Sequence, residues 1–100
     1  DVGRLAQAMA VAKASHQPLF VGEFGVPRAA AGESRAKFAA ILLAIETNQV
    51  PLAALWVFDF KGQDKDWNVS VTNDRSWQLD ALQQANVVKV DLATEPNGKN

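Results

Sequence analysis

Glu23 and Trp56 are the two residues of this sequence best placed to do chemistry together. Glu23 follows a short, wholly apolar run, Leu19–Val21, that ends at Gly22, and Trp56 lies near the end of a second apolar run, Leu52–Phe58. Runs that are apolar on both alternate faces are typical of buried parallel strands. The carboxyl ends of such strands meet at one edge of a sheet, where α/β folds bind their ligands. The spacing therefore predicts a carboxylate and an indole at one binding site.

The alternation of side chains along a strand predicts which residues share a face. If both strands belong to a closed barrel, the sets that point inward are Leu19, Val21 and Glu23 on the first strand, and Leu52, Ala54, Trp56 and Phe58 on the second. Glu23 then stands at the rim of the barrel beside Trp56. The alternative is a structural role, in which the Glu23 carboxylate forms an ion pair with Arg28.

Asp59 and Trp67 are further candidates for the same site, because both lie in the connection 59–72 after the second run. Connections of that length are uncommon in compact domains unless they are functional. Trp67 could stack on a ligand or pack against its own loop, and Asp59 could accept a ligand hydrogen bond or cap the loop. Trp77 belongs to a predicted helix, where we expect it to pack with Ala81.

No metal and no cofactor is predicted. The Asp64-x-Asp66 pair lacks the third carboxylate, the glycine and the closing glutamate of a calcium loop. Gly22-x-x-Gly25 has neither the dinucleotide nor the phosphate-loop spacing. The one histidine has no companion ligand, and the sequence holds no cysteine. Asn68-Val69-Ser70 matches an N-glycosylation acceptor.

The apolar periodicity predicts an α/β fold with the order helix, strand, helix, strand, helix. The first helix is expected over 1–15 with Asp1 as its cap, and Pro18 ends it. A loop over 24–32 leads to a second helix that stops near Asn48, before Pro51. A third helix is expected from Asn73 or Asp74 to about Asn86. After it, Val88, Val90 and Leu92 alternate as in a strand, and 95–100 has a disordered composition.

The composition is that of an ordinary globular protein: 100 residues, 48% hydrophobic, with a formal net charge of −1. The balance of charges gives no basic surface for nucleic acid or for an anionic membrane. The longest apolar stretch, Phe38–Ile45, is far shorter than the roughly 18 residues of a spanning helix. Because the chain begins at Asp1 rather than Met, we expect natural sequence upstream of it.

The phrase Pro18-Leu19-Phe20-Val21-Gly22-Glu23-Phe24-Gly25, followed by Leu55-Trp56-Val57-Phe58-Asp59, resembles the last two strands of glycoside hydrolase family 5. These are cellulase-like (β/α)₈ barrels, and the resemblance covers about residues 1–86. It implies the C-terminal portion of a TIM barrel, with Glu23 as the nucleophile of a retaining glycosidase and Trp56 as the surface under the sugar. It also implies a cis peptide after Trp56 and a secreted or periplasmic location. Trp67 and Asp59 are then candidates for outer sugar contacts, beside their structural alternatives.

The resemblance also shows what this sequence lacks. The family's acid/base is the Glu of an Asn-Glu pair on an earlier strand, and no such pair occurs here. We therefore expect 1–86 to be part of a catalytic domain that acts on β-linked poly- or oligosaccharides, inactive without the preceding part of the barrel, and 87–100 to be an extension or linker. The rival interpretations are a non-catalytic carbohydrate-binding barrel and an unrelated α/β module with Glu23 in a structural ion pair.

Overall fold

A computed structural model describes residues 2–94 of the chain as three α-helices and a two-stranded parallel sheet. The elements are α1 (Val2–Ala14), β1 (Phe20–Phe24), α2 (Ala31–Thr47), β2 (Leu52–Leu55), the short 3₁₀ helix η1 (Lys61–Gln63) and α3 (Trp77–Thr94). The α/β class and the predicted order of helices and strands are confirmed. Asp1, the predicted cap of the first helix, and 95–100 lie outside the described residues.

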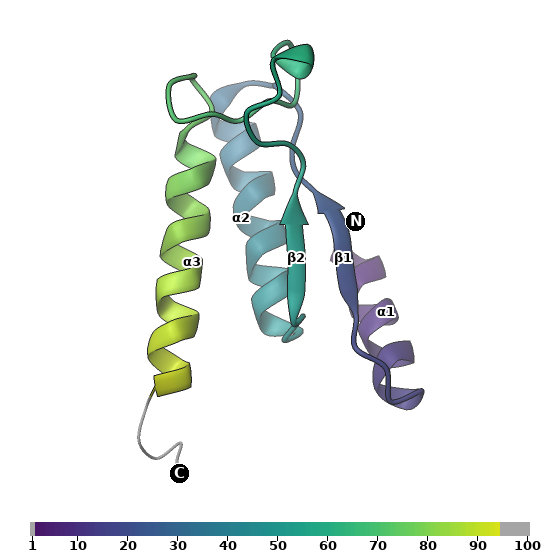
Figure 1. Cartoon of the computed structure of the whole chain (residues 1–100). Coiled ribbons are helices and arrows are strands. Elements are labelled where there is room, and N and C mark those ends of the chain that lie inside the picture. Colours follow the sequence, from purple (N-terminus) through teal and green to yellow (C-terminus); the bar gives the residue numbers. More distant parts are fainter. Residues whose placement is uncertain (1, 95–100) are drawn as a thin grey trace.

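Figure 1 shows α1 and α2 behind the two strands, with α3 beside α2. Within the described part of the chain, no element covers the face of the sheet that points toward the viewer in Figure 1. Both strands run in the same direction, so the segments that follow them, including η1, gather at one end of the sheet (Figure 1). The helices therefore cover one face, and the connections build one end.

The two strands begin in the same way, because α1 and α2 end in the same hydrogen-bonded motif. His16 and Gln49 adopt left-handed backbone angles, with φ of 56° and 55°. In each case the next amide donates across the end of the helix, as in a Schellman motif. These hydrogen bonds are Gln17 N to Ala12 O at 2.9 Å and Val50 N to Ile45 O at 3.0 Å. A proline follows each motif, Pro18 and Pro51; β2 starts directly after Pro51, and β1 starts at Phe20, one residue later than the predicted Leu19.

The strand register corrects the predicted faces. Phe20 pairs with Leu52 and Val21 with Ala53, but the next pair is Phe24 with Leu55, so β1 carries an extra residue between them. Such a bulge shifts the alternation by one position. Val21 and Phe24 consequently both face the helices, and Phe20 and Leu52 point to the uncovered face, where they are 56% and 61% exposed. The predicted inward position of Leu19 and Val21 is wrong, and the bulge returns Glu23 to the uncovered face.

The packed part of the molecule lies between the sheet and the helices. Phe38, in the middle of α2, is buried against Phe24 of β1 at a ring-centroid distance of 6.0 Å. The edge of its ring meets Trp77 of α3 at 5.4 Å and 86°. Trp77 thus packs against Phe38 of α2, and the Arg35 guanidinium lies 4.7 Å from its ring centroid. The contact of Trp77 with Ala81 stays a prediction. Phe38 therefore links β1, α2 and α3.

The predicted boundaries of two elements, β2 and α3, are wrong. The strand β2 ends at Leu55 rather than at Phe58, and Phe58 instead makes an isolated bridge to Val69. The helix α3 begins at Trp77 rather than at Asn73 or Asp74, because 71–76 form bends and turns. It continues to Thr94 rather than ending near Asn86, so the alternating residues after Asn86 are helical and form no strand. No helix among residues 2–94 has the length and apolarity needed to cross a membrane.

Candidate functional site

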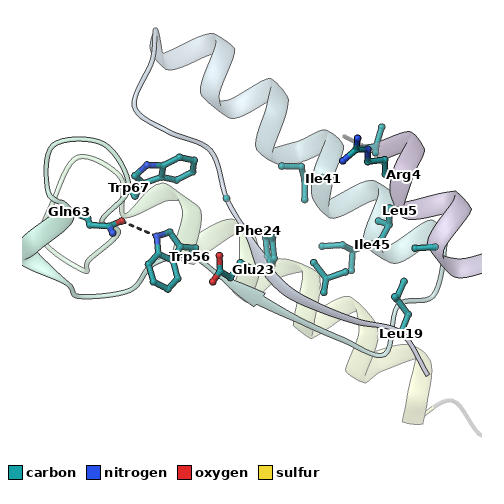
Figure 2. Close-up of a pocket in the computed structure, with 14 residues that line it drawn as sticks. Arg4, Leu5, Leu19, Glu23, Phe24, Ile41, Ile45, Trp56, Gln63 and Trp67 are labelled. Carbon is teal, nitrogen blue, oxygen red and sulfur yellow. Dashed lines mark hydrogen bonds between the residues drawn. The ribbon is translucent and has the colours of Figure 1, made fainter. Parts of the chain in front are cut away.

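A pocket of about 810 Å³ runs along β1 beside α1 and α2 and reaches the end of the sheet where the connections gather. Figure 2 shows Glu23 and Trp56 close to this end, with Trp67 and Gln63 in the loop beyond them. The pocket also extends along β1 to apolar side chains of α1 and α2, among them Leu5, Leu19, Val21, Ile41 and Ile45. Three of the four predicted site residues, Glu23, Trp56 and Trp67, therefore line one pocket, whereas Asp59 does not line it.

Glu23 is exposed at the end of β1, and no ion pair engages its carboxylate within the described part of the chain. The predicted alternative, an ion pair with Arg28, does not form, because the Arg28 guanidinium binds the Asp74 carboxylate instead. Glu23 sits on the bulge of β1, which turns it to the uncovered face. The carboxylate is consequently available to a molecule that enters the pocket.

Gly25 explains why Trp56 stands so close to the end of β1. A Cβ atom at position 25 would lie 2.6 Å from the Trp56 carbonyl oxygen, closer than real Cβ atoms come to backbone. The absence of a side chain lets the two backbones meet, and the Trp56 amide donates to the Phe24 carbonyl at 2.7 Å. The peptide bond between Trp56 and Val57 is cis, as expected. A glycine two residues after Glu23 therefore brings the indole to the carboxylate.

The loop between β2 and α3 is held together by the buried side chain of Asn68, which is 2% exposed. Its Oδ1 accepts from the Phe60 amide at 2.7 Å, and its Nδ2 donates to Asp64 at 2.5 Å. Both ends of this amide are thus occupied inside the fold. Asn68 is consequently inaccessible to a glycosyl group in the folded chain, although its sequence matches the acceptor pattern.

Arg28 fastens the β1–α2 loop to the β2–α3 loop. Its amide donates to the Asp66 carbonyl at 2.8 Å, and its Nε donates to the Lys65 carbonyl at 2.9 Å. Its guanidinium also donates to the carboxylate of Asp74. This hydrogen bond from Arg28 holds the pKa of the Asp74 carboxyl below its ordinary value. The loop that carries Trp67 and Gln63 is thereby tied to the loop that follows Glu23.

Arg75 and Gln78 are two buried polar side chains near the start of α3, 3% and 0% exposed. A guanidinium nitrogen of Arg75 donates to the Val26 carbonyl, whereas its Nε and both amide atoms of Gln78 have no partner. Burial lowers the pKa of the Arg75 guanidinium, and the nearby Arg28 charge lowers it further. Neither residue lines the pocket.

Asp59 lies outside the pocket, with a left-handed backbone at φ 53°. Its amide donates to the Val69 carbonyl at 2.8 Å, which closes the loop onto the end of β2. No group of His, Cys, Asp or Glu side chains suited to a metal ion occurs among residues 2–94. The polar and indole groups that line the pocket are one carboxylate, two indoles, one primary amide and the Arg4 guanidinium on α1. With one acid and one base, this set suits a neutral, hydroxyl-rich ligand with an apolar face.

Gln63 is a site residue that the sequence does not predict. Its side-chain oxygen accepts a hydrogen bond from the Trp56 indole nitrogen at 2.9 Å (Figure 2). A glutamine in a polar loop has no pattern that marks such a contact before the loop is folded. Comparison with known protein families, curated proteins and solved structures gives no match to this chain.

Proposed function

We propose that this chain forms part of the active site of a retaining glycoside hydrolase, with Glu23 as the nucleophile and Trp56 as the surface under the reacting sugar. The observation that carries the proposal is the meeting of Glu23, Trp56 and Trp67 around one pocket at the carboxyl end of two parallel strands. The resemblance of the Glu23 and Trp56 segments to glycoside hydrolase family 5 is consistent with this arrangement.

The chemistry requires an exposed carboxylate next to an apolar surface. A carboxylate oxygen of Glu23 attacks the anomeric carbon, and the bond from that carbon to the leaving oxygen breaks while a second carboxylic acid protonates this oxygen. Water, deprotonated by the second group, then displaces Glu23 from the sugar. The C–H face of a pyranose stacks on the Trp56 indole, which holds the anomeric carbon near Glu23.

The second carboxyl group is not among the described residues that line the pocket, where Glu23 is the one acid. In a retaining enzyme the two carboxyl groups lie about 5 to 5.5 Å apart. The acid/base must therefore come from elements that cover the open face of the sheet. This requirement agrees with the exposure of Phe20 and Leu52 on that face, because large apolar side chains there lack a covering layer within residues 2–94.

The two indoles indicate an extended substrate. Trp67 lies in the loop beyond Trp56 and lines the same pocket, so it can take a second sugar residue of a chain whose first sugar stacks on Trp56. The described lining holds one acid, Glu23, and one base, Arg4, which lies on α1. We therefore propose neutral β-linked poly- or oligosaccharides as the substrate, without a choice among glucan, mannan and xylan.

The test is Glu23→Gln in the full-length protein, assayed on oligomers of β-1,4-linked glucose, mannose and xylose. Loss of the nucleophile should lower turnover by about 10³-fold or more, because covalent catalysis is removed while the shape of the pocket is kept. Glu46→Gln, a change of the same type at an exposed position of α2 away from the pocket, is the matched control.

A mechanism-based 2-deoxy-2-fluoro glycoside should label the wild-type protein, with the added mass on the peptide that contains Glu23. Turnover that survives Glu23→Gln, or labelling of another residue, would contradict the assignment.

A non-catalytic carbohydrate-binding role is the second candidate, favoured by the presence of one carboxylate in the described lining. It predicts that the wild-type protein binds the same oligosaccharides without cleaving them, and that Glu23→Gln leaves the dissociation constant unchanged. Isothermal titration with the uncleaved oligosaccharide separates the two roles.

A further inference from the structure

The hydrogen bond between Trp56 and Gln63 fixes the orientation of both side chains. The indole nitrogen is a donor only, so the group that meets it must be the oxygen of the Gln63 amide. The two atoms are 2.9 Å apart, an ordinary hydrogen-bond distance. Because the contact joins β2 to the turn after it, it determines where the plane of the indole lies relative to the pocket that both residues line.

Backbone hydrogen bonds hold Gln63 in place and so fix the point from which its side chain reaches Trp56. Its carbonyl accepts from the amides of Trp67 at 3.0 Å and Asn68 at 2.9 Å, and its own amide donates to the Phe60 carbonyl at 3.0 Å. Asn68, which closes the same turn, is itself buried. Backbone hydrogen bonds to Phe60, Trp67 and Asn68 therefore fix the position of Gln63, and its side chain extends from this turn toward Trp56.

Trp56 needs such a partner because packing alone does not hold it. Its side chain stands at the uncovered end of the sheet and is 36% exposed, in contrast to Phe38, which is 1% exposed. An exposed indole retains rotation about two side-chain bonds, and a ligand that stacks on it must stop this rotation. A partner that already fixes the ring reduces that entropic loss.

We propose that Gln63 is the positioning residue for Trp56: its side-chain oxygen holds the indole in the plane on which a sugar ring stacks. The sugar part of this inference rests on the proposed function, whereas the positioning part rests on the hydrogen bond alone. Gln63 touches Trp56 and not the reacting atoms, so its effect passes through the indole.

The experiment records the indole N–H signals of the full-length protein labelled with ¹⁵N-tryptophan. Trp56→Phe identifies the signal of Trp56. Gln63→Leu removes the acceptor, and we expect the Trp56 signal to move and its hydrogen exchange to accelerate at least tenfold. Gln63→Glu keeps an oxygen acceptor at the same reach and should restore both the position and the slow exchange. Gln84→Leu, an exposed change on α3, is the matched control.

The same variants are then titrated with the β-1,4-linked oligosaccharide that binds best, in the Glu23→Gln background. Loss of one hydrogen bond of about 0.5 to 1.5 kcal/mol corresponds to a roughly twofold to tenfold weaker binding for Gln63→Leu. Gln63→Glu should bind like the parent.

An unchanged Trp56 signal in Gln63→Leu, or a Gln63→Glu variant that behaves like Gln63→Leu, would overturn the positioning role. If the Trp56 signal responds as expected but the wild-type protein neither binds nor cleaves any of the oligosaccharides, the proposed function fails and the positioning of the indole stands. The two failures are therefore distinguishable.

Discussion

The two ends of the sheet differ in how alike the segments of the two units are. Where the strands begin, both units use one design: a helix closed by a left-handed residue, His16 or Gln49, and then a proline before the strand. Where the strands end, the designs diverge. A short loop, 25–30, follows β1, whereas 56–76 follows β2 and carries η1 and the second indole.

The difference separates the residues that form the fold from those that serve the site. The repeated end needs only backbone geometry, and its polar side chains do not line the pocket. At the divergent end, a glycine, a buried asparagine and an arginine hold a carboxylate and two indoles together. In βα-barrels the carboxyl end of the strands carries catalysis and the amino end carries stability. In these two units the candidate site residues Glu23, Trp56 and Trp67 likewise lie at the carboxyl end.

Gly25→Ala should give the largest change at the divergent end. The added methyl group would lie 2.6 Å from the Trp56 carbonyl, so β1 and Trp56 must move apart. Overpacking of this kind costs about 1 to 3 kcal/mol in free energy of unfolding. We also expect the indole signal of Trp56 to shift.

The matched control for Gly25→Ala is Gly22→Ala on the same strand, whose Cβ would lie 3.6 Å from the Phe20 ring, an ordinary contact. Urea unfolding and the indole spectrum measure both effects. Equal destabilisation by the two variants would contradict the specific role given to Gly25.

Gln49→Gly should have a smaller and opposite effect at the repeated end. Glycine removes the strain of a left-handed conformation, about 1 to 2 kcal/mol, but also loses chain entropy on folding. We expect a net gain of about 0.5 to 1 kcal/mol, with the same sign for His16→Gly. Urea unfolding measures the gain, and activity should stay unchanged. A loss of stability in both variants would contradict the assignment of His16 and Gln49 to left-handed positions of a Schellman motif.

The Asp74–Arg28 pair should give the smallest effect, because both side chains are exposed and salt screens them. The pKa of the Asp74 carboxyl is lowered in the folded state by Arg28, so its contribution is present above the ordinary pKa of about 4 and is lost as the pH falls through the folded pKa.

Asp74→Asn should therefore flatten the acid limb of the unfolding free energy against pH. Glu33→Gln, which removes the exposed Glu33–Lys37 pair on α2, is a control outside the loops. The protection of the Asp66–Asn68 amides against hydrogen exchange, corrected for the intrinsic rate at each pH, should fall at low pH in the wild type. In Asp74→Asn this protection should not change over the same pH range.

Local signals in the sequence were enough to predict the elements. The prolines at 18 and 51 mark where the strands start, and the apolar spacing of Phe38, Ile41, Leu42 and Ile45 predicts α2. The same signals placed Glu23 and Trp56 at one end of the sheet, where the pocket lies. Each of these features depends on backbone restriction or on periodic burial, which a short stretch of sequence determines.

Features that depend on tertiary contacts were not predictable. Arg28 has acidic residues on several segments within reach, and only the folded loops decide that Asp74 is its partner. The extra residue in β1 depends on the pairing with β2, so the period-two rule assigned Val21 to the wrong face. The alternation after Asn86 suits a strand, yet without a neighbouring strand the helix simply continues to Thr94.

The bulge at Gly22 and Glu23 gives the strand two phases. Before it, odd positions such as Val21 face the helices, and after it, even positions such as Phe24 do so. The face on which the Glu23 carboxylate lies thus depends on the number of residues between Val21 and Phe24, and not only on their types. Deletion of Gly22 would restore a single phase and would leave Val21 facing the helices and Glu23 on the uncovered face, where they are now. We therefore expect the strand to accept one residue fewer at this position while the acid stays on the side of the indole.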